Sequence, residues 1–79
     1  MIDTVYVFQA GEKNPELVTY IGVHNGVRCQ EAIGTPKFLA GPIIDLRSQG
    51  YKIILDVMPN GKEAKINRDT RMNLGALLT

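Results

Sequence analysis

The chain has 79 residues, 44% of them hydrophobic, and its nine basic and eight acidic residues leave a formal net charge of +1. This length predicts one domain over residues 1–79 with a core that is only just large enough to stabilise the fold. The hydrophobic fraction excludes an intrinsically disordered chain. The balanced charge argues against a dedicated binder of polyanions and against an acidic mimic of DNA.

The first half of the chain predicts three strands, two of them joined by a tight turn. Residues 2–9 are rich in β-branched and aromatic side chains, which is typical of a strand, and a polar connection follows. Residues 17–24 and 27–33 flank the dipeptide Asn25-Gly26. A type I′ turn needs a positive φ at both central residues, and Asn-Gly meets this need at the lowest steric cost. We therefore expect a hairpin here.

A helix is predicted after this hairpin, but in two pieces. Thr35 is typical of an N-cap, and the proline after it suits the first helical position. Because Pro42 would cost ~3 kcal/mol inside a continuous helix, we expect a short turn over residues 36–40 and a helix over residues 42–49. Gly50 stands where a helix C-terminus needs a residue in the left-handed conformation. The side chains expected to face the sheet are Ile43, Ile44 and Leu46.

A second dipeptide of the same kind, Asn60-Gly61, predicts another hairpin. Residues 51–58 form the expected fourth strand. With a two-residue loop, Asp56 lies opposite Lys65, which gives the solvent-facing side of this hairpin an ion pair. The other expected pairs are Val57 with Ala64 and Leu55 with Ile66.

The C-terminal residues 68–79 leave two alternatives open. With Asp69 or Thr70 as a cap they form a short helix docked on the sheet, or else they are a partly ordered segment broken at Gly75. The expected fold is α+β, with a single mostly antiparallel sheet of about five strands in the order β-β-β-α-β-β. It contains one main helix and, in the first alternative, a short C-terminal helix.

The single cysteine, Cys29, excludes an intramolecular disulfide and a cysteine-rich zinc site, which favours a reducing compartment. The N-terminal residues show neither the basic part nor the long apolar part of a signal peptide. No apolar run approaches the ~20 residues that span a bilayer. We therefore expect a cytoplasmic protein with no membrane partner.

The first hairpin carries a group of residues that resembles a catalytic site. A two-residue loop places His24 opposite Val27 and Cys29 opposite Gly22. His24, Cys29 and Glu31 then share one face, as a base, a thiol nucleophile and an orienting carboxylate would. However, a lone cysteine in a strand is usually a small apolar residue, and nothing supplies an oxyanion hole. Binding is therefore favoured over catalysis, and no catalytic residue, metal ligand or cofactor is assigned.

A nucleic-acid-binding module is the alternative from another class. Its candidate residues form a local basic group: Lys52, Lys65, Arg68 and Arg71. Arg68 and Arg71 are three residues apart, so a helix would place them side by side. The acidic neighbours Asp56 and Glu63 weaken the positive potential around the two lysines.

A surface that binds another protein is the leading interpretation. The first strand and the first hairpin are apolar on both faces, whereas a single helix covers only one face of a sheet. The second face therefore needs the C-terminal segment, a second copy of the chain or a partner protein. We expect a small regulatory or inhibitory module that acts by surface contact, as many compact proteins of this length do, including those of phages and mobile elements. The residues expected to be exposed for binding are Tyr20, His24 and Glu31, with Tyr20 opposite Glu31.

Overall fold

The computed structural model describes residues 3–11 and 13–79, so the start of the predicted first strand at Ile2 lies outside the described residues, as does Glu12 in the connection after it. The element order is β1 (Thr4–Gln9), β2 (Val18–His24), β3 (Val27–Gly34), α1 (Pro36–Ser48), β4 (Lys52–Leu55) and α2 (Arg68–Leu78). The sheet order is β3-β2-β1-β4, with β1 antiparallel to β2 and parallel to β4. This confirms the α+β class and the mostly antiparallel sheet, with four strands instead of about five.

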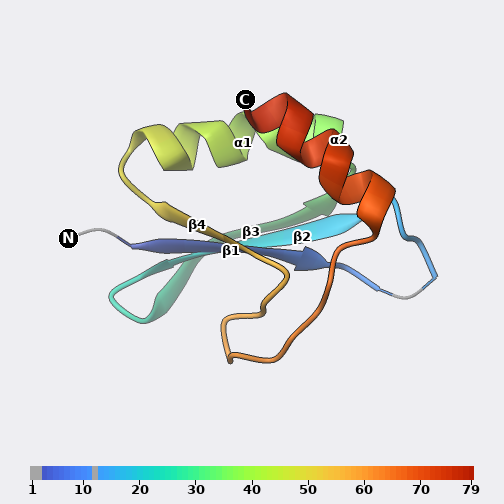
Figure 1. Ribbon diagram of the computed structural model, residues 1–79. Helices are drawn as coiled ribbons and strands as arrows, with labels where there is room; N and C mark the ends of the chain where they lie inside the picture. Colours follow the sequence, from blue (N-terminus) through green and yellow to red (C-terminus); the bar gives the residue numbers. More distant parts are fainter. Residues whose placement is uncertain (1–2, 12) are drawn as a thin grey trace.

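Both helices lie on one side of the sheet, as Figure 1 shows. Side chains alternate along a strand, so Val5 and Val7 face the helices while Tyr6 and Phe8 face away from them. The C-terminal segment therefore adds to the covered face and does not cover the second one. The largest fully buried side chains are Leu39, Ile43, Leu74, Val5, Val7 and Val18.

The first hairpin forms at Asn25-Gly26 as predicted. The φ angles of Asn25 and Gly26 are 53° and 78°, as a type I′ turn requires. His24 pairs with Val27, which is the predicted closing pair of the hairpin. The local sequence thus determines the turn and the first pair of this hairpin.

A β-bulge at Cys29 shifts the rest of the hairpin by one residue. The pairs around it are Val23 with Arg28, Gly22 with Gln30, Ile21 with Glu31 and Tyr20 with Ala32. The predicted pairs Cys29–Gly22 and Glu31–Tyr20 are therefore wrong. The Cys29 thiol donates a hydrogen bond to the backbone carbonyl of Gly22 at 3.4 Å, which holds the extra residue against β2.

α1 is one continuous helix, so the predicted break before Pro42 is wrong. The proline removes one backbone hydrogen bond and costs ~3 kcal/mol. The same helix buries Leu39, Ile43 and Leu46 to 2% exposure or less, and full burial of one such side chain contributes about 1.5–3 kcal/mol. An unbroken helix keeps all three on the core side, so the gain from burial outweighs the cost of the proline.

The C-terminus of α1 confirms the prediction for Gly50, which has a φ of 99°. The backbone N–H of Gly50 donates to the carbonyl of Arg47 at 3.0 Å, and that of Tyr51 donates to the carbonyl of Leu46 at 3.1 Å. These two hydrogen bonds are those of a Schellman motif, which needs a left-handed residue at this position. At the other end of the helix, Thr35 occupies the N-cap position as predicted.

The second Asn-Gly dipeptide does not join two strands. β4 ends at Leu55, three residues before the predicted end, and pairs in parallel with β1. Asp56 has a φ of 70°, which turns the chain out of the strand, and within the dipeptide Gly61 alone has a positive φ, 88°. A bridge between Val57 and Glu63 takes the place of the predicted register. The fifth strand is therefore absent from residues 56–66, all of which the structure describes.

Residues 56–66 extend to the side of the sheet opposite the helices, as Figure 1 shows. The backbone N–H of Gln9 donates to the carbonyl of Ala64 at 3.1 Å, which fixes this segment to the end of β1. On the face away from the helices, Phe8 and Ile21 are 6% and 5% exposed. The centre of the second face is thus buried within the chain itself.

The C-terminal segment forms a helix, which is one of the two predicted alternatives. The side chain of Asn67 accepts a hydrogen bond from the backbone N–H of Asp69 at 3.1 Å, so Asn67 is the cap in place of the predicted Asp69 or Thr70. Thr70 is buried instead, and its hydroxyl donates to the carbonyl of Pro15 at 2.6 Å. Gly75 does not interrupt the helix, whose apolar side is buried in the core.

Candidate protein-binding surface

Large apolar side chains are exposed at the outer edge of the sheet, beside β3. Val27 and Ile33, near the two ends of β3, are 65% and 61% exposed. Phe38 in the first turn of α1 is 71% exposed. Its ring lies over the end of β3, because a Cβ atom built on Gly34 would come within 2.9 Å of a Phe38 ring carbon. These three residues, Val27, Ile33 and Phe38, are called the β3 apolar group below.

β3 is also an unpaired edge. It is the outer strand of the sheet, and in the described part of the chain no strand lies on its far side. The strand is eight residues long and has no proline. An edge of this length presents a row of backbone N–H and C=O groups that a further strand can pair with.

Two opposite charges lie side by side on the β3 edge. An Arg28 guanidinium nitrogen is 3.8 Å from a Glu31 carboxylate oxygen, and the two side chains are 63% and 62% exposed. Such an exposed pair contributes little to the stability of the fold. Glu31 is thus exposed, as the sequence predicts for a binding residue.

Tyr20 lies in the core, so its predicted exposure is wrong. It is 5% exposed and lies opposite Val7 on the face that the helices cover. Its hydroxyl group is 3.2 Å from the side-chain oxygen of Gln30, to which it donates a hydrogen bond. Burial raises the pKa of the Tyr20 hydroxyl group above its ordinary value of 10.0. The sequence shows two apolar rows along β2 but does not show which row the helices cover.

His24 is held by Asp3, not by Glu31. The Asp3 carboxylate is 9% exposed, contacts the Nδ1 atom of His24 and accepts a hydrogen bond from the backbone N–H of Asn25 at 3.1 Å. Burial acts to raise the pKa of Asp3, but the hydrogen bonds from Asn25 and His24 outweigh it and hold the pKa below its ordinary value. The backbone carbonyl of Asp3 also accepts from the N–H of Lys52. Asp3 therefore fixes the tip of the first hairpin to the rest of the sheet.

His24, Cys29 and Glu31, the residues that resemble a catalytic site in the sequence, each contact a different partner in the structure. Besides its bond to Gly22, the Cys29 thiol lies 3.7 Å from the Tyr51 hydroxyl group, and this hydrogen bond raises the pKa of Tyr51. His24 contacts Asp3, and Glu31 contacts Arg28. The described residues contain no group of three histidine, cysteine or acidic side chains placed to hold a metal ion.

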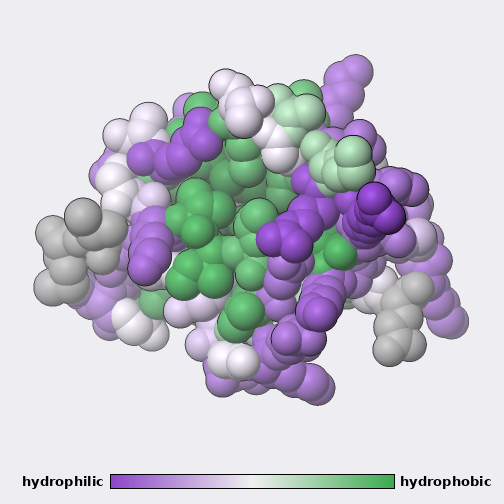
Figure 2. All heavy atoms as spheres, in the orientation of Figure 1, coloured by the Kyte–Doolittle hydropathy of each residue, from purple (hydrophilic) through white to green (hydrophobic). Residues whose placement is uncertain are grey.

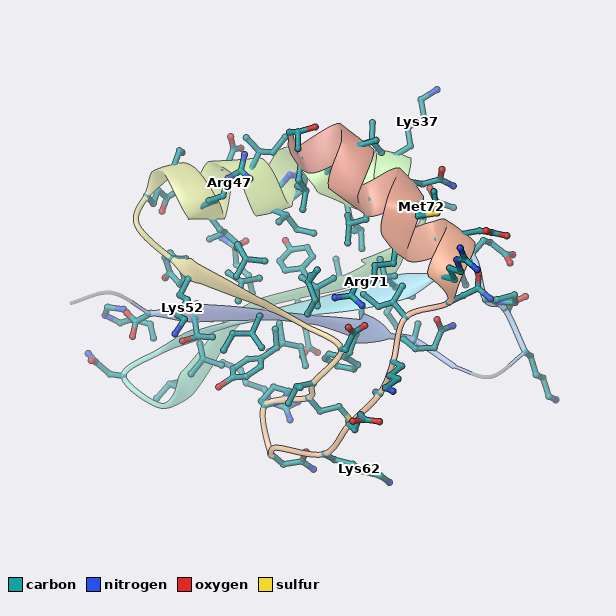
Figure 3. The ribbon with its side chains drawn as sticks, viewed as in Figure 1. Lys37, Arg47, Lys52, Lys62, Arg71 and Met72 are labelled. Atoms are coloured by element: carbon teal, nitrogen blue, oxygen red, sulfur yellow. The ribbon has the colours of Figure 1, made fainter. Side chains whose placement is uncertain are left out.

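Two of the four candidate nucleic-acid-binding residues are paired with carboxylates. Arg71 is 3.1 Å from an Asp56 carboxylate oxygen, and Lys65 is 3.8 Å from Glu63. The predicted pair of Asp56 with Lys65 is therefore wrong. Figure 3 shows Lys52 at the start of β4, well apart from Arg71 on α2. Arg68 lies one helical turn before Arg71, as the sequence predicts.

The surface has two other features besides the β3 edge. A groove of about 480 Å³ runs between the start of α1 and α2. Figure 2 shows apolar atoms gathered over β4, between the helices and residues 56–66. Ile53 and Leu55 in this region are half-buried and pack against the core. The residues that line the groove are Glu16, Thr35, Pro36, Lys37, Asn73, Ala76 and Leu77.

Sequence reasoning missed the β3 apolar group, because an apolar residue in a strand or helix is first read as a core residue. Val27 and Ile33 belong to the predicted hairpin, and Phe38 to the predicted turn after it. The observed strand order, with β3 outermost, is what leaves them exposed.

Comparisons of the chain with models of known families, with curated proteins and with solved structures found no match. Among the described residues, no helix is long and apolar enough to cross a membrane.

Proposed function

We propose that the protein is a small binding module that acts by surface contact with a protein partner through its β3 edge. The observation that supports this proposal is the β3 apolar group, which lies along an unpaired strand of eight residues. Val27 and Phe38 lie on the helix side of the sheet and Ile33 on the other side, so exposed apolar residues flank both sides of an edge that a partner strand can pair with.

Addition of a partner strand is the mode of recognition that this edge suits best. In that mode, backbone hydrogen bonds supply affinity, and the side chains of alternate residues supply specificity. Glu31 lies in the middle of β3, and His24 at the turn that precedes it, so the two predicted binding residues that are exposed belong to this hairpin. A regulatory or inhibitory role, expected from the small size of the chain, needs nothing beyond such a contact.

A nucleic-acid-binding module remains the alternative proposal, with Lys52, Lys65, Arg68 and Arg71 as its contact residues. The carboxylates beside Lys65 and Arg71 compete with phosphate groups for these two side chains. Salt separates the two proposals, because each phosphate contact lowers affinity as ionic strength rises, whereas an apolar strand interface responds weakly.

The test is capture of partners from the native lysate, treated with nuclease, by tagged protein and by two variants. Val27→Lys with Ile33→Lys changes the β3 edge, and Met72→Lys is the matched control, since Met72 is 65% exposed on α2. We expect capture of a protein that resists high salt and is lost only in the β3 variant. Equal capture by all three proteins would overturn the proposed surface. Capture that disappears with nuclease or salt would favour the nucleic-acid alternative.

A further inference from the structure

We infer that the partner on the β3 edge is a second copy of this chain, with the two β3 strands antiparallel and Arg28 of each copy opposite the partner's Glu31. This inference rests on the proposed use of the β3 edge and names its occupant. It would join two sheets of four strands into one continuous sheet of eight.

The charged residues of β3 can pair with those of β3 in a second copy of the chain. Two identical antiparallel strands are related by a two-fold axis, so every contact between them occurs twice. With the axis between Cys29 and Gln30, both copies place Arg28 against the partner's Glu31. Two other registers are disfavoured by charge: an axis through Arg28 opposes two arginines, and an axis through Glu31 opposes two glutamates.

The β-bulge makes this register compatible with the faces of the sheet. Residues directly opposite each other in an antiparallel pair point to the same face. Arg28 and Glu31 pair with Val23 and Ile21 of β2, which are two residues apart, so both side chains lie on the face away from the helices. In a regular strand, residues three apart would lie on opposite faces. The extra residue, Cys29, removes this conflict.

The same register covers exposed apolar side chains on the other face. Val27 comes opposite the partner's Ala32, and both point to the helix side, because they pair with His24 and Tyr20 of β2. A two-fold axis perpendicular to the sheet also places the helices of both copies on one side. Phe38 lies over Gly34, which is two residues beyond Ala32 on the same face, so the Phe38 ring approaches the partner's Val27 diagonally.

The third member of the apolar group, Ile33, lies on the face away from the helices, because it pairs with Thr19 of β2. It also lies beyond the last pair of this register, since the partner's chain turns back at Asn25-Gly26. The register therefore covers Val27 and brings Phe38 towards it, while the four charges form two pairs across the axis.

The test is the oligomeric state of the purified protein, measured by sedimentation equilibrium from about 1 µM to about 500 µM with charge-reversal variants. We expect a dimer that is weakened about tenfold by Arg28→Glu or by Glu31→Arg, since each single change places like charges opposite each other twice. The double variant Arg28→Glu with Glu31→Arg restores the pairs and the dimer. Lys65→Glu, which reverses a charge in the exposed pair with Glu63, is the matched control and leaves the dimer unchanged.

Circular dichroism of each variant confirms that the fold is kept. A wild-type protein that stays monomeric over the whole range overturns the inference, as does a dimer that the single reversals do not weaken. A monomer that still captures a lysate protein through Val27 and Ile33 overturns the inference but leaves the proposed function standing. A wild-type protein that neither dimerises nor captures a lysate protein overturns both the inference and the proposed function.

Discussion

The two edges of the sheet differ in how their unpaired backbone is treated. β3 is eight residues long, and most of its side chains are exposed. β4 is four residues long, and the chain after it folds back against the end of β1. Edges are a risk for unwanted pairing, and proteins commonly shorten or cover them. The β4 edge is thus tied into the fold, whereas the β3 edge is unpaired among the described residues, as the proposed binding surface requires.

Asp56 holds the β4 edge in place. Its backbone N–H donates to the carbonyl of Val7 at 2.8 Å, and its own carbonyl accepts from Ala64 at 2.9 Å. Its carboxylate accepts from the backbone N–H of Ile66 at 3.0 Å and lies 3.1 Å from the Arg71 guanidinium. One residue therefore connects β4, β1, residues 56–66 and α2.

The largest expected effect contrasts two adjacent residues of α1. Leu39→Ala should lower the free energy of unfolding by about 2–5 kcal/mol, because Leu39 is fully buried and its loss leaves a cavity. Phe38→Ala should change it by less than about 0.5 kcal/mol, since Phe38 is 71% exposed at the β3 edge. Urea unfolding at low protein concentration measures both. A large loss of stability in Phe38→Ala would mean that the β3 apolar group serves the fold.

The next effect tests the anchor of the β4 edge. Asp56→Ala should cost about 2–3 kcal/mol, because it leaves the N–H of Ile66 without its acceptor and places alanine at a φ of 70°. Glu63→Ala, at a carboxylate that is 70% exposed in the same segment, should cost less than about 0.5 kcal/mol. Thermal and urea unfolding compare the two. Equal losses of unfolding free energy in the two variants would mean that Asp56 does not anchor the β4 edge.

A smaller effect compares the two Asn-Gly dipeptides. Asn25→Val should cost about 1–2 kcal/mol, because a β-branched residue is strained at a φ of 53°. Asn60→Val loses the hydrogen bond from the N–H of Lys62 to the Asn60 side chain, 2.9 Å long and exposed, and should cost about 0.5 kcal/mol. If Asn60→Val proves the more costly, the second dipeptide has the hairpin geometry that the structure gives to the first.

The smallest effect is a pH dependence at the tip of the β2–β3 hairpin. The folded-state pKa of Asp3 lies below its ordinary value of 3.8, so its carboxylate contributes stability above about pH 4 that is lost as the pH falls through the lowered pKa. Asp3→Asn should remove this part of the acid dependence. Unfolding free energies between about pH 2 and pH 6, with an NMR titration of the Asp3 carboxyl group, measure it. An Asp3 pKa above 3.8 would contradict the prediction.

The sequence predicted only part of the candidate site. Glu31 and His24 lie exposed on the first hairpin as predicted, because the turn at Asn25-Gly26 is a local property, but the predicted shared face is wrong: the bulge at Cys29 places the two residues on opposite faces of the sheet. Tyr20 was placed on the wrong face, since two apolar rows look alike until the helices cover one of them. Salt bridges such as that of Arg71 with Asp56 join residues whose proximity depends on the whole fold.

The sequence by itself determined the type I′ turn at Asn25-Gly26, the helix end at Gly50 and the α+β class. Each follows from dihedral preferences or from apolar periodicity within a few residues. Tertiary structure alone decided the bulge at Cys29, the unbroken helix through Pro42 and the parallel pairing of β4 with β1. In α1 the burial of Leu39, Ile43 and Leu46 outweighs the local cost of Pro42, ~3 kcal/mol, and the other two features depend on pairing with strands distant in the sequence.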